Sequence, residues 1–217
     1  GQTPAAAVDL LAFSSGALIE PVAAPYSDAW DGLWLLDEDA QTGWANAEGA
    51  KPPFELVVSL PEQSRFSRFV FDTQGVEAPA KAAREIDILI SDQSAGAGFT
   101  RIMSVALGDA ADGQGFDVPA GVAATGRWVK FVLKSNHGDE GYLELMNVHG
   151  FGVAVSSTPI ANVSGTYEGG EYGKFHLLQT GAQLTGCDEF NEGMVQGGLE
   201  GHLMWLAWSE EKGAKSG

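Results

Sequence analysis

The stretch LLDEDAQTGWANAEG, from Leu35 to Gly49, gathers several residues that could carry chemistry. Asp37 and Asp39 lie two positions apart, so in extended chain their side chains point to the same side, and Thr42 follows within the same turn-rich segment. A hard cation such as Ca²⁺ takes about six to eight oxygen ligands from carboxylates, carbonyls and hydroxyls. The stretch therefore indicates either a cation site or a solvated acidic loop.

Glu144 is a second acidic signal, far along the chain. It interrupts the apolar run YLELMNV, where a neutral residue would be expected. A carboxylate that faces a core must be paired or bound to a metal. The alternative is that Glu144 lies on an exposed face and is solvated.

Aromatic residues precede the acidic stretch. Trp30 and Trp34 flank the tripeptide DGL, and Tyr26 lies just upstream. An aromatic ring matches the apolar C–H face of a sugar, while polar side chains match its hydroxyls. The candidate ligand-binding residues are Tyr26, Trp30, Trp34, Asn136 and His137. The alternative is that both tryptophans cover the edge of the core and that His137 is an ordinary surface-turn histidine.

Enzymatic chemistry has weaker support. Asp31, Asp37 and Asp39 could form a pair of carboxyl groups spaced as in a glycosidase, but adjacent acids in one solvated loop have no evident means of raising one pKa. The histidines are scattered without zinc spacing, and the Gly-rich pieces lack the phosphate-binding motifs. We predict that the chain is not an enzyme.

Composition narrows the partners. The 217 residues carry a formal net charge of −17, which disfavours nucleic acid and anionic lipid surfaces as partners. Cys187 is the single cysteine, so no intrachain disulfide forms, as is common in cytosolic and bacterial envelope proteins. No apolar run approaches the ~18 residues that span a bilayer. The chain begins GQTP without Met, as a mature protein lacking its signal peptide would.

The pattern of apolar residues predicts an all-β chain. Runs rich in β-branched and aromatic residues alternate with turn clusters, and only residues 79–85 favour a helical turn. In the run RWVKFVLKS, Val129, Phe131 and Leu133 should share one face, with Lys130 and Lys134 on the other. The expected strands are residues 54–60, 68–73, 85–91, 100–107, 127–135 and 142–152. They predict an antiparallel β-sandwich over residues 1–153.

The remainder of the chain has a different style. Residues 154–164 are small and uncharged and suggest a linker. Residues 165–217 predict a meander of about four short strands, which is too few for a closed barrel of about eight. We expect an incomplete β-meander that docks on the first domain or pairs with the tail of another copy.

Three motifs, in order, carry a resemblance to a known family. They are WLLDEDAQTGWAN, PPFELVVSLPE and GRWVKFVLKSNHGDEGYLELMNVHGFG. Together they resemble the coagulation factor 5/8 type C (discoidin) family, a galactose-binding-like jelly roll, in its bacterial carbohydrate-binding branch. Phe54 stands where the family has Trp, Glu38 stands where it has Gly, and its terminal Cys pair is absent. The tail resembles, on Gly and turn spacing, the first half of a lipocalin- or avidin-like β-meander.

The family resemblance implies specific roles. It implies a structural Ca²⁺ held by Asp37, Asp39, Thr42 and Glu144 with carbonyls near Trp34, and a Trp44 buried beneath this loop. It also implies a sugar site at the loop-bearing end of the sandwich.

These expectations combine into one prediction and two alternatives. The prediction is a non-catalytic carbohydrate-binding module, stabilised by calcium, of a secreted, periplasmic or cell-envelope protein of bacterial origin. Its partners would be a glycan and, through the C-terminal strands, a second copy. The first alternative is a structural or protein-interaction module of a multidomain envelope protein with no sugar site. The second is a tail that, once complete, encloses a small apolar ligand.

Overall fold

The computed structural model describes residues 7–20, 24–155, 162–170, 173–189, 192–200, 203–210 and 215–217. The chain divides into two compact units, Gly1–Thr158 and Pro159–Gly217, and each is described by itself. Over the described residues the secondary structure consists of β-strands and short 3-10 helices. No helix in these parts is long and apolar enough to cross a membrane.

The N-terminal unit is an antiparallel sandwich. Its strands are β1 (Val8–Asp9), β2 (Leu18–Ile19), β3 (Trp44–Ala45), β4 (Phe54–Asp72), β5 (Ala83–Ser91), β6 (Thr100–Ala106), β7 (Gln114–Asp117), β8 (Thr125–Asn136), β9 (Glu144–Leu145) and β10 (Asn147–Ala154). The 3-10 helices are η1 (Phe13–Ser15), η2 (Asp28–Trp30), η3 (Gly32–Leu36) and η4 (Pro79–Lys81). All strand pairs are antiparallel, and β3 and β9 form a small sheet of their own.

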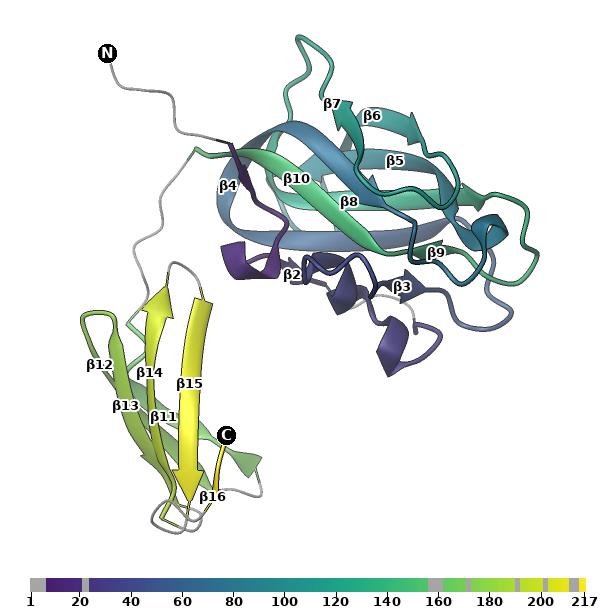
Figure 1. Cartoon of the computed structure of the whole chain (residues 1–217). Helices are drawn as coiled ribbons and strands as arrows, with labels where there is room; N and C mark the ends of the chain where they lie inside the picture. The colour runs from purple at the N-terminus through teal and green to yellow at the C-terminus, as the bar shows by residue number, and fades with distance from the viewer. Residues whose placement is uncertain are drawn as a thin grey trace. The chain divides into compact units, whose positions relative to one another are not determined.

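The long strand β4 belongs to both layers of the sandwich. Residues 54–59 pair with β8 and residues 64–72 with β10; Ser64 and Arg65 also pair with β8, after a register shift between Ser59 and Ser64. Figure 1 shows β4 curving round one end of the sandwich to make this passage. Its two halves correspond to the predicted strands 54–60 and 68–73, and the turn expected between them is wrong because the chain stays extended through the bend.

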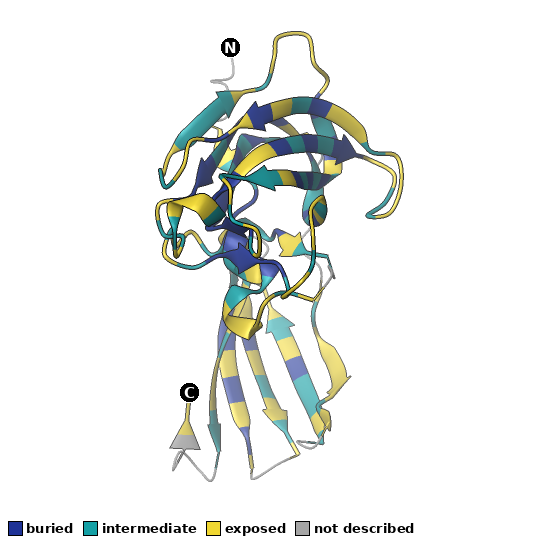
Figure 2. Cartoon of the chain, turned by 90° about the vertical axis from the view of Figure 1, so that its right-hand side faces the viewer, coloured by how far each residue is buried: buried dark blue, intermediate teal, exposed yellow. Residues whose placement is uncertain are grey.

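The core lies between the two layers. Phe69 and Phe71 of β4 meet the edge of Phe131 of β8, with ring centroids 6.2 and 5.9 Å apart, and all three side chains are fully buried. The predicted face of β8 is confirmed, since Val129, Phe131 and Leu133 are each 0% exposed. Figure 2 shows the same alternation of buried and exposed residues along the sandwich strands.

Two further strand predictions need correction. The expected strand 142–152 is broken at Met146 into β9 and β10, which lie in different sheets. The segment GQGFDVPAG, for which the sequence predicts no strand, contains β7, which pairs with β4 through Phe116 and its neighbours. The single helical turn expected near residues 79–85 is confirmed as η4.

The C-terminal unit is a meander. Its described strands are β11 (Gly165–Glu168), β12 (Lys174–Thr180), β13 (Gln183–Asp188), β14 (Met194–Glu200), β15 (Leu203–Glu210) and β16 (Lys215–Ser216), each paired with the next. The sequence predicts about four strands in this unit, with residues 199–208 as the last of them. In the structure, β14 and β15 are two separate strands that pair antiparallel. The sequence does not predict β14 because two of its seven residues, Gly197 and Gly198, have low strand propensity.

One face of this sheet is apolar. Cross-strand register places Phe175, Leu177, Leu184, Val195 and Leu206 on the same side. Leu177, Leu184 and Val195 are buried, as the alternating colours in Figure 2 show for these strands.

Candidate functional site

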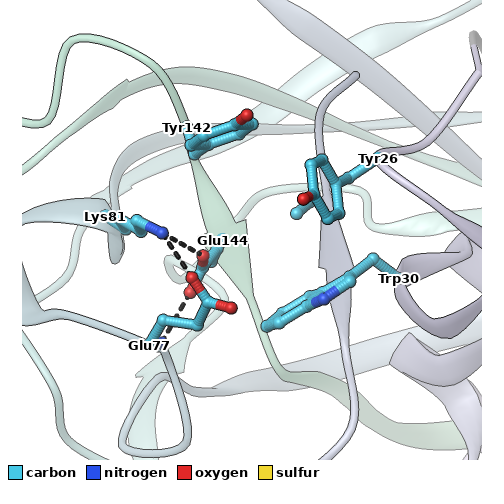
Figure 3. Close-up of a pocket in the computed structure, with 7 residues that line it drawn as sticks. Tyr26, Trp30, Glu77, Lys81, Tyr142 and Glu144 are labelled. Atoms are coloured by element: carbon cyan, nitrogen blue, oxygen red, sulfur yellow. Dashed lines mark hydrogen bonds and ion pairs between the residues drawn. The ribbon is translucent and has the colours of Figure 1, made fainter. Parts of the chain in front are cut away.

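A pocket at one end of the sandwich brings together residues from three loops. It is a small hollow open to solvent, and it is lined by Tyr26, Trp30, Ala45, Glu77, Lys81, Tyr142 and Glu144. Figure 3 shows Tyr26 and Trp30 on one side, Glu77, Lys81 and Glu144 on the other, and Tyr142 above the charged residues. Of the predicted ligand-binding residues, Tyr26 and Trp30 line this pocket.

Main-chain bonds fix the two aromatic residues of the first loop. The Tyr26 N–H donates to the Ala45 carbonyl at 3.0 Å, which ties the loop to β3. Trp30 ends η2, and its N–H donates to the Ser27 carbonyl at 2.9 Å. Tyr26 is 52% exposed and Trp30 is half-buried, so both rings present surface to solvent.

The turn between β8 and β9 positions Tyr142. Asp139 Oδ1 accepts hydrogen bonds from the N–H groups of Gly141 and Tyr142, and these bonds lower the pKa of Asp139. Asn136 Nδ2 donates to the carbonyls of Asp139 and Tyr142. The Tyr142 ring then meets Tyr26 edge to face, with centroids 5.3 Å apart.

Asn136 and His137, which we predicted to bind the ligand, have other contacts. Both ends of the Asn136 side-chain amide make hydrogen bonds within the turn between β8 and β9. The nitrogen makes the two described above, and the oxygen accepts one from the Gly138 N–H. His137 Nε2 lies 3.1 Å from the Leu107 carbonyl oxygen. Neither residue lines the aromatic pocket, so its polar groups come from other residues.

Trp34 is also outside the pocket. Its indole Nε1 donates to the Asp28 carbonyl at 2.8 Å, which closes the loop on itself. Its own carbonyl oxygen faces the acidic loop instead.

Three charged residues form the opposite wall. Glu144 is almost wholly buried, accepts a hydrogen bond from the Glu77 N–H at 2.7 Å and lies 3.4 Å from Lys81 Nζ. Lys81 also pairs with the Glu77 carboxylate, and its ammonium lies 5.0 Å from the centre of the Tyr142 ring. Glu144 is thus a paired buried carboxylate, one of the two states expected for it.

The electrostatics of this wall follow from burial and pairing. Burial raises the pKa of Glu144, while the Glu77 N–H and Lys81 oppose that rise. The hydrogen bond to Glu77 raises the pKa of Lys81. The net effect is a raised pKa, so burial outweighs the two partners that stabilise the ionised form of Glu144.

The acidic loop closes around a different set of oxygens. Asp37 Oδ2 accepts from the Thr42 hydroxyl at 2.6 Å, and the same hydroxyl lies 3.0 Å from the Asp39 carbonyl. The Asp39 carboxylate itself accepts from the Gln41 N–H. Asp39 therefore presents its main-chain oxygen, not its carboxylate, to the centre of the loop.

Asn147, which the sequence prediction missed, reaches into this centre. Its Nδ2 lies 3.1 Å from Asp37 Oδ1 and 3.5 Å from the carbonyl oxygens of Trp34 and Asp39. The residue is 1% exposed, and its Oδ1 is buried without a hydrogen-bond partner. Glu144, expected in this set, contacts Glu77 and Lys81 instead.

The donor set fits a hard cation. If the Asn147 side-chain amide were rotated by 180°, its Oδ1 would face the other oxygens of the loop. That arrangement is favourable only if a cation lies between Oδ1 and these oxygens. Carboxylate, hydroxyl, amide and carbonyl oxygens are the ligands that Ca²⁺ takes. Over the described residues, no group of three or more His, Cys, Asp or Glu side chains gathers to hold a metal, so main-chain oxygens would have to contribute.

Close backbone packing holds the loop in place. A Cβ on Gly43 would collide with main-chain atoms of Leu145 and Met146, so only glycine lets the loop lie against this segment. Glu38, where the resembling family has Gly, has a φ of 63°, in the left-handed region that favours glycine. Trp44, which follows directly, is 3% exposed, as expected of a core anchor.

Sequence comparisons and structural comparisons give different answers. No protein-family model matches the chain, and no curated protein is similar to it in sequence. Solved structures do match. Module CBM32-3 of a family 31 glycoside hydrolase from Clostridium perfringens has a TM-score of 0.55 at 14% identity, over 68% of this chain and 95% of that module.

Two further matches have the same fold. The family 32 carbohydrate-binding module of C. perfringens NanJ, solved in complex with galactose, has a TM-score of 0.52 at 12% identity, over 67% of this chain and 98% of that one. An F5/8 type C domain from Bacteroides fragilis has a TM-score of 0.54 at 12% identity, over 67% of this chain and 95% of that one.

These likenesses confirm the predicted all-β, F5/8 type C-like sandwich. They do not support the lipocalin- or avidin-like resemblance of the tail.

Proposed function

We propose that this chain is a non-catalytic carbohydrate-binding module that holds a sugar in the Tyr26–Trp30–Tyr142 pocket. The observation that supports it most is the pocket itself, in which Tyr26 and Trp30 lie opposite charged side chains and Tyr142 adds a third ring beside them. Such rings take the apolar face of a sugar, and the polar groups take its hydroxyls. The fold is that of modules solved with galactose-containing sugars, which favours the same class of ligand.

The pocket offers unused hydrogen-bonding groups to such a ligand. The hydroxyls of Tyr26 and Tyr142 lie at its rim, and the Trp30 indole directs its six-membered ring toward Glu144 (Figure 3). Glu77 is 58% exposed and uses one carboxylate oxygen for Lys81, which leaves the other to accept from a hydroxyl.

A structural calcium ion belongs to the same proposal. Asp37, Thr42 and Asn147 would hold it by side-chain oxygens, and Trp34 and Asp39 by their carbonyls. The ion would neutralise the Asp37 carboxylate and give Asn147 Oδ1 the partner that it lacks. The loop would thereby be stiffened close to the aromatic residues that precede it.

A secreted or cell-envelope location in a bacterium fits this function. The structures with the same fold come from Clostridium and Bacteroides, in several cases from glycoside hydrolases. A single cysteine is consistent with a bacterial envelope.

A glycan array with and without Ca²⁺ tests the function. We expect binding to a restricted set of glycans, which Trp30→Ala removes while the melting temperature stays close to that of the wild type. Binding by the wild type to no glycan in either condition, or unchanged binding by Trp30→Ala, would overturn the proposal.

A further inference from the structure

The charge of the pocket distinguishes one class of sugar from another. Two carboxylates, Glu77 and Glu144, face one ammonium, Lys81, so the lining carries a net charge of −1 by simple count. Loss of solvent contact is the main cause that raises the pKa of the Tyr142 hydroxyl; the charges of Glu48 and Asp139 add to the rise, and that of Lys81 opposes it. Carboxylates therefore outnumber cationic groups around the pocket.

Lys81 is not free to bind an anion. Its ammonium pairs with both carboxylates and lies over the Tyr142 ring, and its side chain is only 17% exposed. An acidic sugar would have to displace Glu77 and would leave two carboxylates close together. Such a like-charge approach is unfavourable in a partly desolvated site.

The remaining groups suit a cation. One oxygen of the Glu77 carboxylate has no hydrogen-bond partner in the described structure. An ammonium group is attracted to the face of an aromatic ring within about 6 Å, and the Tyr142 ring already holds that of Lys81, 5.0 Å from its centre. Tyr26 and Trp30 add two more rings around the same space.

We propose that this pocket recognises a hexosamine with a free amino group, whose ammonium is held by Glu77 and the surrounding aromatic rings. This inference rests on the proposed carbohydrate-binding function and adds the charge of the sugar that is bound. A neutral hexose fills the same space with a hydroxyl in place of the ammonium. A charge-assisted hydrogen bond is about twice as strong as a neutral one, so we expect the amino sugar to bind about tenfold more tightly.

Isothermal titration calorimetry or NMR titration with matched sugars tests the inference. One series comprises galactosamine, N-acetylgalactosamine, galactose and galacturonic acid, and a parallel series has glucose configuration. The titrations are run at about pH 6, where an aliphatic amine carries its proton. We expect the free amine to bind best, the acetylated and neutral sugars to be similar, and the acid to bind worst. The preference for the amine should also fall as salt is raised.

Glu77→Gln is the decisive variant. It keeps the main-chain N–H that serves Glu144 and removes one charge, so the preference for the amine should shrink to about twofold or less. Glu55→Gln is its matched control, because Glu55 is also 58% exposed and also pairs with a lysine, Lys130, outside the pocket. This control should keep the full preference.

The outcomes separate the two claims. If Trp30→Ala abolishes binding but amine and parent hexose bind equally, or the acid binds as well as the amine, the charge inference is wrong and the sugar site stands. If no sugar of either series binds, or Trp30→Ala binds like the wild type, the carbohydrate-binding function fails and the inference fails with it.

Discussion

Replacing His149 with Gln should lower the unfolding free energy of the N-terminal sandwich. Alkaline pH should abolish the same contribution in the wild type. His149 of β10 lies between two carboxylates, with Nδ1 2.7 Å from Asp9 of β1 and Nε2 3.0 Å from Asp72 of β4. The hydrogen bond to Asp9 is the main cause that raises its pKa, to about 9, and Asp72 adds to it against the opposing effect of burial. The imidazolium thus ties β10 to the strands on either side of it, β1 and β4.

The magnitude follows from proton linkage. The ordinary pKa of 6.5 and the folded value of about 9 differ by about 2.5 pH units, which corresponds to about 3 kcal/mol. Because the folded-state pKa of His149 is the higher one, the contribution is fully present below about pH 6.5. It is lost as pH rises from there through about 9. For a domain of this size, about 3 kcal/mol shifts the melting temperature by roughly 6–12 °C.

Urea denaturation of the wild type and of His149→Gln, from about pH 6 to about pH 10, measures this difference. The gap between their unfolding free energies should shrink by about 3 kcal/mol across that range. His137→Gln is the control, since its ring contacts a main-chain carbonyl and not a carboxylate. A gap that stays constant with pH, or a control with the same alkaline slope, would refute the reasoning.

Three other predictions concern the acidic loop and the tail. Calcium at about 100 times its Kd should stabilise the wild type by about 2.7 kcal/mol, as measured by thermal melts with and without chelator. Asp37→Ala should lose this stabilisation. Asp39→Ala should keep most of it, because Asp39 presents its main-chain carbonyl to the site. Glu38→Gly should raise the unfolding free energy by up to about 1 kcal/mol in urea, since it relieves a φ of 63°, and a loss of stability would contradict this. Trp205 and Trp208 are 52% and 43% exposed, so the whole chain should self-associate with rising concentration in analytical ultracentrifugation. The N-terminal unit alone should be a monomer. A monomeric whole chain would refute this prediction.

The sandwich could be predicted from sequence because its strands carry their own signal. Val129, Phe131 and Leu133 alternate with lysines, and the two sides of that alternation become core and surface. Strands whose register depends on distant partners gave no such signal. β7 contains Gly115 and one aromatic residue, and it is a strand because β4 lies beside it.

The site was only partly predictable for the same reason. Tyr26 and Trp30 were found from their residue types, but the residues opposite them were not, because Glu77 and Lys81 belong to an unremarkable turn before β5. The topology of the sandwich brings that turn to the end of β9, through a bridge between Ala82 and Glu144. No local pattern encodes this meeting.

Asn147 could have been found by the argument used for Glu144. Both interrupt the same apolar run, and both are buried polar residues that need partners. Because the strand is interrupted between β9 and β10, the two side chains point to different sites. Glu144 lines the aromatic pocket, and Asn147 contacts the acidic loop. A one-residue irregularity in a strand therefore decides which of the two could bind a metal.

The most direct test of the central claim is an NMR titration that follows the tryptophan indole N–H signals as galactose or galactosamine is added, with Trp30→Phe used to assign one of them. Trp30 lines the pocket, Trp44 is buried in the core and Trp34 is bonded to the Asp28 carbonyl. We predict a saturable shift of the Trp30 signal, with the Trp44 signal unchanged and the Trp34 signal nearly so. A saturable shift confined to other tryptophans would place the sugar elsewhere, and the absence of any shift at saturating sugar would contradict the account.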